Sequence, residues 1–360
     1  MGSERRVEEP KPRGLPMFIG SLPFEDHHES LEYVLERTPQ SPHWVQLPFH
    51  PAEGFLVQFS EGLPGLRTEP ALRVYNQGDE FQRELLQFYE DYLAATEGTL
   101  DLDGSRFSVS VRAAPGLPLF LERVRGIQGV EFVKGQLSGP LSVLVGIQDS
   151  RGRLAYYDER VREAMVKLLS LKAKWQTRRL GDLGAKPMVF VDEPALGNLG
   201  SSAFISISPL GALEDLGEIL GAIQEEGGWP GVHVCANADW GSLLALGRIK
   251  VLSFDAFSYF QRLSLFREQV IEFLLRGGVL AWGVVPTRPE ELEGVSAEHL
   301  VRGFLDGAER LAQGELSPVE VLERTFITPA CGLGSLDRRH AILAMDLTVE
   351  VSARLRERLG

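Results

Sequence analysis

Short runs of β-branched, aromatic and aliphatic residues recur at eight places along the chain, and each run ends at a glycine, a proline or a polar residue. Runs of this length and composition are typical of strands that are buried on both faces of a parallel sheet. We therefore expect strands at residues 17–22, 44–48, 132–137, 188–194, 232–236, 251–257, 279–285 and 325–329.

The segments between these runs have the three-to-four-residue spacing of apolar positions that indicates amphipathic helices. In one of them a single apolar stripe is formed by Leu213, Leu216, Ile219, Leu220 and Ile223. Similar periodicity predicts helices at 156–180, 259–275, 297–311 and 338–359. Strand and helix alternate eight times, which predicts an α/β fold of the closed (β/α)8 type, a TIM barrel. An open doubly wound sheet is the alternative, but no glycine-rich phosphate-binding turn follows an early run.

One region departs from this alternation. Between the second and third expected strands lies an insertion at about residues 60–130, in which we expect helices near 80–93 and 118–125 and a strand at 106–111. Insertions of this length are usually lids or partner surfaces at one end of a barrel. Residues 1–14 are charged and contain proline, and we expect a disordered tail there, before a single catalytic domain at 15–360.

The composition, with 44% hydrophobic and 24% charged residues, is typical of a globular protein. The formal net charge of −13 provides no basic surface for DNA or RNA, so we expect no nucleic-acid partner. The longest apolar stretches are too short to span a bilayer, and the N-terminus lacks a signal-peptide pattern. We therefore expect no membrane partner and a cytoplasmic location, where two cysteines favour a reactive or metal-bound thiol over a disulfide.

Polar side chains stand at the carboxyl ends of most expected strands, where barrel enzymes build their active sites. They are Ser21, Gln46, Gln136, Asp192, Glu193, His233, Cys235, Asp255 and Cys331. His233 and Cys235 are two residues apart on one expected strand, so their side chains point the same way. Two thiolates and an imidazole are a plausible ligand set for zinc. The chain has only two cysteines, and both occupy strand ends.

The residues at the strand ends also have purely structural interpretations. Free cysteines are frequently buried core residues that bind nothing. Asp192 and Glu193, which precede a proline, could form a cap or a loop ion pair. Asn237 and Asp239, just after Cys235, either orient the side chain of His233 or form the turn into the next helix.

The neighbouring histidines His27 and His28 resemble metal ligands and lie near the active end of the expected barrel, where a minor role with substrate stays open. Asp26 and Glu29 have the spacing of a capping box that opens the first helix, which places His27 and His28 in its first turn, exposed to solvent rather than bound to metal. We interpret the remaining histidines as structural: His43, His50, His299 and His340.

Five short motifs are distributed over residues 19–333, nearly the whole chain. They are Ile19-Gly20-Ser21, Ser138-Gly139-Pro140, Val191-Asp192-Glu193-Pro194-Ala195-Leu196, His233-Val234-Cys235 and Pro329-Ala330-Cys331-Gly332-Leu333. In this order they resemble the catalytic C-terminal barrel of cobalamin-independent methionine synthase, within the superfamily that also contains uroporphyrinogen decarboxylase.

The resemblance implies a set of zinc ligands. In that family Zn²⁺ is held by the His-x-Cys pair, by the late cysteine and by a carboxylate on the following strand. This implies His233, Cys235 and Cys331 as metal ligands and catalytic residues. Asp255 falls in the carboxylate position, where the family has a glutamate, so its backbone would have to approach the metal differently.

The resemblance also implies where a substrate would bind. Homocysteine in the family is held by the Ile-Gly-Ser segment and by the aspartate of the Asp-Glu-Pro motif, which correspond to Ile19, Ser21 and Asp192. Gln58 falls where the family has a further glutamate. A neutral amide at that position is expected to weaken recognition of an amino group, which leaves the identity of the thiol open.

The implied activity is zinc-dependent methyl transfer to a thiol such as homocysteine, the reaction that completes methionine biosynthesis. The family's N-terminal barrel, used with folate, has no counterpart here, and Val285-Pro286-Thr287 stands where the family has a histidine that assists the leaving group. We therefore expect the donor to be a methylated corrinoid, free or on a corrinoid protein docked at the insertion, rather than polyglutamyl folate. The alternatives are a metal-free lyase like uroporphyrinogen decarboxylase and a non-catalytic protein that binds zinc or a corrinoid partner.

Overall fold

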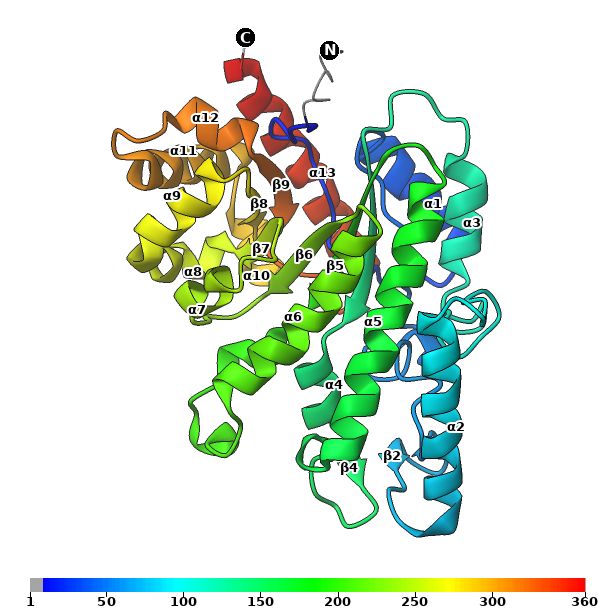
Figure 1. Ribbon diagram of the computed structural model, residues 1–360. Coiled ribbons are helices and arrows are strands. Elements are labelled where there is room, and N and C mark those ends of the chain that lie inside the picture. Colours follow the sequence, from blue (N-terminus) through cyan, green and yellow to red (C-terminus); the bar gives the residue numbers. More distant parts are fainter. Residues whose placement is uncertain (1–8, 360) are drawn as a thin grey trace, which may run out of the picture.

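The central feature of the computed structural model, which describes residues 9–359, is an all-parallel six-stranded sheet that curls into half a barrel (Figure 1). The strand order across the sheet is β3-β5-β6-β7-β8-β9. The bounds are β3 (Phe132–Ser138), β5 (Lys186–Asp192), β6 (Trp229–Val234), β7 (Val251–Asp255), β8 (Val279–Val285) and β9 (Thr325–Pro329). These six expected strands are confirmed, with ends that shift by up to three residues.

The first two expected strands take a looser form. At residues 17–22 and 44–48, and at the residue just before each range, the chain forms isolated parallel bridges instead of continuous strands. The bridges pair Pro16 with Ile327, Ser21 with Gln46, and His43 with Lys134. Ile327 belongs to β9 and Lys134 to β3, so the two segments lie between the two edges of the half-barrel.

Apolar side chains cover both faces of the sheet, as continuous apolar runs in parallel strands require. The inner face holds its own buried cluster, which includes Phe132, Phe190, Trp229 and Phe326, together with Met17 from the N-terminal segment. The outer face packs against the surrounding helices in a larger cluster. The sheet therefore encloses a filled interior at its amino end, and the polar strand ends are left at its carboxyl end.

Helices follow the strands and cover the outer face (Figure 1). Their bounds are α1 (His27–Arg37), α4 (Pro140–Gly146), α5 (Glu159–Gly181), α6 (Pro209–Glu225), α7 (Trp240–Ala245), α8 (Ala256–Leu263), α9 (Arg267–Leu275), α10 (Pro289–Gly294), α11 (Ala297–Ala312), α12 (Pro318–Glu323) and α13 (Arg338–Arg356). Short 3₁₀ helices are η1 (Pro51–Glu53), η2 (Ala155–Tyr157), η3 (Pro194–Asn198), η4 (Ser202–Phe204), η5 (Ser264–Phe266) and η6 (Glu357–Leu359). The expected helices are confirmed, although η5 divides the one expected at 259–275. Within residues 9–359, none of the helices is long and apolar enough to cross a membrane.

The insertion contains the two expected helices, α2 (Gly78–Thr96) and α3 (Gly116–Val124). A small sheet of β1 (Leu66–Arg67), β2 (Arg73–Val74) and β4 (Gln148–Asp149) ties it to the chain that follows α4. The strand expected at 106–111 is wrong, because this segment forms turns. Its alternating apolar residues Phe107 and Val109 are buried, but Ser105 and Ser108 bond to nearby backbone groups, and such local bonds compete with a strand ladder.

The expected disordered tail, residues 1–14, lies partly outside the described residues, which begin at residue 9. Lys11 Nζ donates a hydrogen bond of 3.0 Å to Glu323 Oε2. The amides of Arg13 and Gly14 donate to the carbonyl oxygens of Glu323 and Thr325, at 2.9 and 2.8 Å. Residues 9–14 therefore run against the chain that enters β9.

Candidate metal centre

A row of polar side chains crosses three neighbouring strands at the carboxyl end of the sheet. Asp192 of β5 is in register with His233 of β6, and His233 is in register with Ser253 of β7. Register partners in a sheet point to the same face. The imidazole of His233 is therefore flanked by a carboxylate on one side and a hydroxyl on the other.

The structure brings together His233, Cys235 and Cys331, whose potential ligand atoms all lie within 4.8 Å of one another. Cys235 directly follows β6, and Cys331 follows β9, so the sheet curvature brings distant parts of the chain together. His233 is only 3% exposed, while both cysteines remain partly accessible. The pairing of His233 with Cys235 is the arrangement expected from their spacing, and Cys331 completes the group.

The imidazole of His233 is oriented as a metal ligand requires. Its Nδ1 lies 2.8 Å from Ser253 Oγ. Its Nε2 is shielded from solvent and has no hydrogen-bond partner within residues 9–359. A ligating histidine usually has its second ring nitrogen fixed in this way, and a Cys₂His set suits zinc. The three side chains therefore fit a zinc ion, with His233 Nε2, Cys235 Sγ and Cys331 Sγ as the groups that would hold it.

The pKa values of the two thiols shift in opposite directions. Interaction with the Cys331 thiol and with His233 outweighs the effect of burial and lowers the pKa of Cys235 to about 4. The proximity of Cys235, together with burial, raises the pKa of Cys331. These opposite shifts favour ionisation of Cys235 before Cys331. A bound cation would favour deprotonation of the second, because metals deprotonate the thiols that coordinate them.

Asp255, the expected fourth ligand, is not part of this group of three. It ends β7, as expected, but its Oδ1 accepts a 2.8 Å hydrogen bond from Ser258 N and caps α8. Burial raises the pKa of Asp255 against the effect of this cap. The shorter aspartate side chain is thus engaged by its own helix, and its role as a ligand stays a prediction.

Asp192 ends β5 and Glu193 follows it as the first residue outside the strand, and the two side chains have different surroundings. Asp192 Oδ1 is shielded and finds no hydrogen-bond partner in the described part of the chain. Burial raises the pKa of Asp192 to about 6, although His233 and Lys134 oppose this. Glu193 is fully engaged elsewhere, because its carboxylate accepts from the amides of Ser142 and Leu141 at 2.7 and 3.1 Å. Glu193 forms no side-chain cap before Pro194, where the cap was expected, and bonds instead to the first turn of α4, while Asp192 is in register with His233.

Ser21 and Ile19, the expected substrate-binding residues, lie beside the site in different ways. The Ser21 backbone oxygen accepts from Leu333 N at 3.0 Å, and its Oγ accepts from Gly334 N at 3.3 Å. Ser21 is thus held against the segment that carries Cys331. Ile19 is buried, and its carbonyl oxygen accepts a hydrogen bond from Lys134 Nζ.

Gln58 is a buried residue whose amide is engaged by the protein. Its Oε1 accepts from Gln46 Nε2 at 2.7 Å, and its Nε2 donates to Ala113 O at 2.7 Å. The side chain therefore links the carboxyl end of the second expected strand to the insertion. The expected contact between Gln58 and the substrate stays a prediction. These two hydrogen bonds do not favour it, because they already occupy both polar atoms of the amide.

Two polar residues near the site were not anticipated as functional. Ser253 orients His233, and the serine inside the apolar run Val-Leu-Ser-Phe was the available signal. Lys134 is fully buried, with Nζ 4.7 Å from the centre of the Phe190 ring, and burial lowers its pKa to about 8 against the opposing charge of Asp192. A lysine inside the run Phe-Val-Lys-Gly-Gln-Leu was the corresponding signal.

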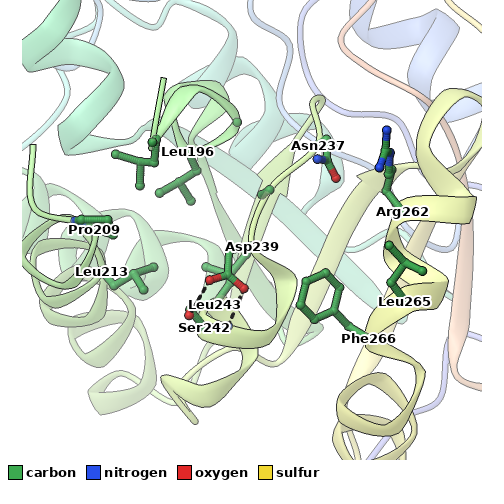
Figure 2. Close-up of a pocket in the computed structure, with 14 residues that line it drawn as sticks. Leu196, Pro209, Leu213, Asn237, Asp239, Ser242, Leu243, Arg262, Leu265 and Phe266 are labelled. Carbon is green, nitrogen blue, oxygen red and sulfur yellow. Dashed lines mark hydrogen bonds between the residues drawn. The ribbon is translucent and has the colours of Figure 1, made fainter. Parts of the chain in front are cut away.

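A cavity of about 430 Å³ lies beyond the ends of β5 and β6 (Figure 2). Leu196 and Leu213 line one side of it, and Leu265 and Phe266 line the other. Asp239 reaches this cavity but accepts from Ser242 N at 3.2 Å and caps α7, which supports its interpretation as a turn residue. The lining includes none of the three candidate zinc ligands, although Asn237, two residues after Cys235, belongs to it.

Comparison with protein-family models gives no match to this chain, and comparison with curated proteins gives no significant similarity.

Proposed function

We propose that this protein is a zinc-dependent methyltransferase, of the cobalamin-independent methionine synthase type, that methylates a thiol such as homocysteine. The observation that carries the proposal is the His233 Nε2, a shielded nitrogen without a hydrogen-bond partner in residues 9–359, beside two cysteine thiols. This group lies at the carboxyl end of a parallel sheet, which is where barrel enzymes carry out their chemistry.

The fold that we propose with this function is a complete (β/α)8 barrel. The segments expected as strands at 17–22 and 44–48 would act as its first and second strands. The parallel bridges of Pro16 with Ile327 and of His43 with Lys134 support this, because they connect these segments to β9 and β3. Met17 supports it as well, since its side chain packs in the inner cluster of the sheet.

A bound Zn²⁺ ion would keep the substrate thiol in its thiolate form, the nucleophilic one, and fix its position for attack on a methyl group. The protein's own residues would do the rest. Ser253 keeps His233 in one ring orientation through the 2.8 Å contact with Nδ1. Asp192, whose pKa is about 6, is mainly ionised at neutral pH and can accept a hydrogen bond from a substrate ammonium group. Ser21 lies against the Cys331 segment, in reach of the substrate's other end.

The methyl donor that we propose is a methylated corrinoid, free or carried by a protein. Support comes from the end of β8, where Val285-Pro286-Thr287 offers no titratable side chain to protonate a poor leaving group. A corrinoid is a good leaving group and needs no such acid. The insertion that carries α2 and α3 would provide the surface for a corrinoid protein.

The first test is the zinc content of the purified protein and of the variants His233→Ala, Cys235→Ser and Cys331→Ser. We expect about one tightly bound zinc per chain, lost in each variant, because a three-ligand thiolate site binds zinc tightly only when complete. His299→Ala is the matched control, since His299 is exposed on α11. Absence of zinc from the wild type would refute the proposal and favour the metal-free lyase.

The second test is transfer of the methyl group from methylcobalamin to homocysteine by the zinc-loaded protein. Methionine should form with the wild type and the His299→Ala control and be undetectable with Cys331→Ser. A protein that retains zinc but transfers no methyl group, from free or protein-bound corrinoid, to any thiol tested would instead be a binding protein without turnover.

A further inference from the structure

A second group of potential metal ligands lies at the carboxyl end of the sheet, outside the centre described above. It consists of His27, His50 and Glu53, whose ligand atoms also lie within 4.8 Å of one another. His27 is the first residue of α1, and Glu53 ends η1. The solvent-exposed position expected for His27 is therefore wrong, since its Nε2 lies 2.7 Å from Glu53 Oε1. His50, expected to be structural and without partners, stacks on His27 with ring centres 5.0 Å apart.

Each ligand candidate is held in place by a contact on its far side. Glu53 is completely buried, and its Oε2 accepts from Leu47 N at 2.9 Å, which leaves Oε1 directed at the histidines. His50 Nε2 lies 2.8 Å from Glu25 O, which makes Nε2 the protonated nitrogen and leaves a lone pair on Nδ1. Outer contacts that fix the tautomer of a histidine and orient a carboxylate are typical of metal ligands.

An ion pair explains only part of this arrangement. A protonated His27 would satisfy Glu53, but His50 would then stack on a cationic neighbour at an interplanar angle of 16°, and its Nδ1 would have no part in the ion pair. A divalent cation would use both imidazoles in their neutral form together with the buried carboxylate. Its binding would displace the proton between His27 and Glu53.

We propose that His27, His50 and Glu53 form a second metal site, which takes a divalent transition-metal cation such as Zn²⁺ or Co²⁺. Two imidazoles and one carboxylate suit these ions, whereas Mg²⁺ and Ca²⁺ prefer oxygen ligands only. Bonds of ~2.0–2.1 Å in tetrahedral geometry separate two ligand atoms by ~3.3 Å, so the 2.7 Å contact between His27 Nε2 and Glu53 Oε1 has to widen by about 0.6 Å. His27 can make this movement because its side chain is 15% exposed at the start of a helix.

The second site is joined to the surroundings of the first through the side chain of Gln46 and contacts of Ser21. Gln46 Nε2 donates to Glu53 O at 2.9 Å, and Gln46 bridges Ser21, which lies against the Cys331 segment. A cation there would tie the start of α1 to η1 on the active face. Because the set lacks a thiolate, the site should bind more weakly than the His233 centre and fill only when metal is added.

The test is a titration with Co²⁺, followed by calorimetry and visible absorption. The protein is used as purified, and the double variant Cys235→Ser/Cys331→Ser is titrated in parallel. We expect uptake of about one added Co²⁺ per chain with weak d–d absorption and no thiolate-to-metal band, because only nitrogen and oxygen would bind it. This uptake should persist in the double variant, which separates the second site from the proposed catalytic zinc.

Substitutions in the site decide the assignment. His27→Ala and His50→Ala should each lower the affinity for the added Co²⁺ by about tenfold or more, because each removes one ligand. His28→Ala is the matched control, because His28 is the next residue on α1 and is exposed. His50 is partly accessible, so its replacement leaves the core intact. Absence of the added equivalent in wild type, or equal affinity in His27→Ala, His50→Ala and His28→Ala, would overturn the proposal.

Discussion

Replacement of Ser253 by alanine is the sharpest test of the candidate zinc centre, since it changes no proposed ligand. The Ser253 hydroxyl is completely buried and lies 2.8 Å from His233 Nδ1. Alanine removes this partner and leaves the Nδ1 proton unsatisfied in the interior. His233 can then rotate or change its tautomer, and either change withdraws Nε2 from the position between the thiols.

The expected magnitude follows from the loss of one buried hydrogen bond. A buried polar group left without a partner costs about 1–3 kcal/mol. Since 1.4 kcal/mol corresponds to a factor of ten in binding, zinc affinity should fall by about 10- to 100-fold. The loss should be smaller than that caused by His233→Ala, which removes a ligand.

The assay is competition for Zn²⁺ between the protein and a chromophoric chelator, at a fixed pH and ionic strength. Ser352→Ala serves as the control, because Ser352 is also a buried serine, 1% exposed, whose hydroxyl donates to Gly14 O at 2.6 Å, outside the metal centre. Both variants should lose similar stability, whereas only Ser253→Ala should lose zinc affinity. Ser253→Thr, which keeps the hydroxyl, should retain most of it.

The reasoning would be refuted if Ser253→Ala and Ser352→Ala bound zinc equally well while both stayed folded. Such a result would mean that His233 either needs no orientation by Ser253 or is not a ligand. Measuring the zinc affinity of His233→Ala in the same competition assay distinguishes these two outcomes.

Two further predictions concern stability. Gly139→Ala should lower the free energy of unfolding, measured in urea, by about 2 kcal/mol or more, because the new Cβ would lie 2.2 Å from Glu193 Oε2. Gly303→Ala is the control: its Cβ would meet no atom within 4 Å, so the free energy of unfolding should stay the same or rise slightly. Burial lowers the pKa of His43 to about 3. Between its unfolded pKa of ~6.5 and about pH 3, the unfolded state therefore binds a proton at this histidine and the folded state does not. Relative to His43→Phe, the wild type should therefore lose stability by about 1.4 kcal/mol per pH unit between about pH 6 and pH 4, and equal pH dependence of the two proteins would contradict this explanation.

Local patterns in the sequence predict most of the secondary structure. Continuous apolar runs predict the six strands of the sheet, since strands buried on both faces need apolar residues at every position. The alternation at 106–111 is equally clear but produces no strand, because a strand requires a partner as well as a pattern. Residues 17–22 and 44–48 show the intermediate case, in which partners are present but pairing is limited to isolated bridges.

The candidate metal centre was also predictable only in part from the sequence. The two-residue spacing of His233 and Cys235 determines by itself that both side chains point the same way, because strand geometry has a period of two. Residues from different elements could be assigned only by the tertiary structure. It placed Ser253 beside His233, engaged Gln58 and Asp255 in other contacts, and brought His27 to Glu53. A sequence determines the direction of side chains along one element, whereas the packing of distant elements decides which of those side chains meet.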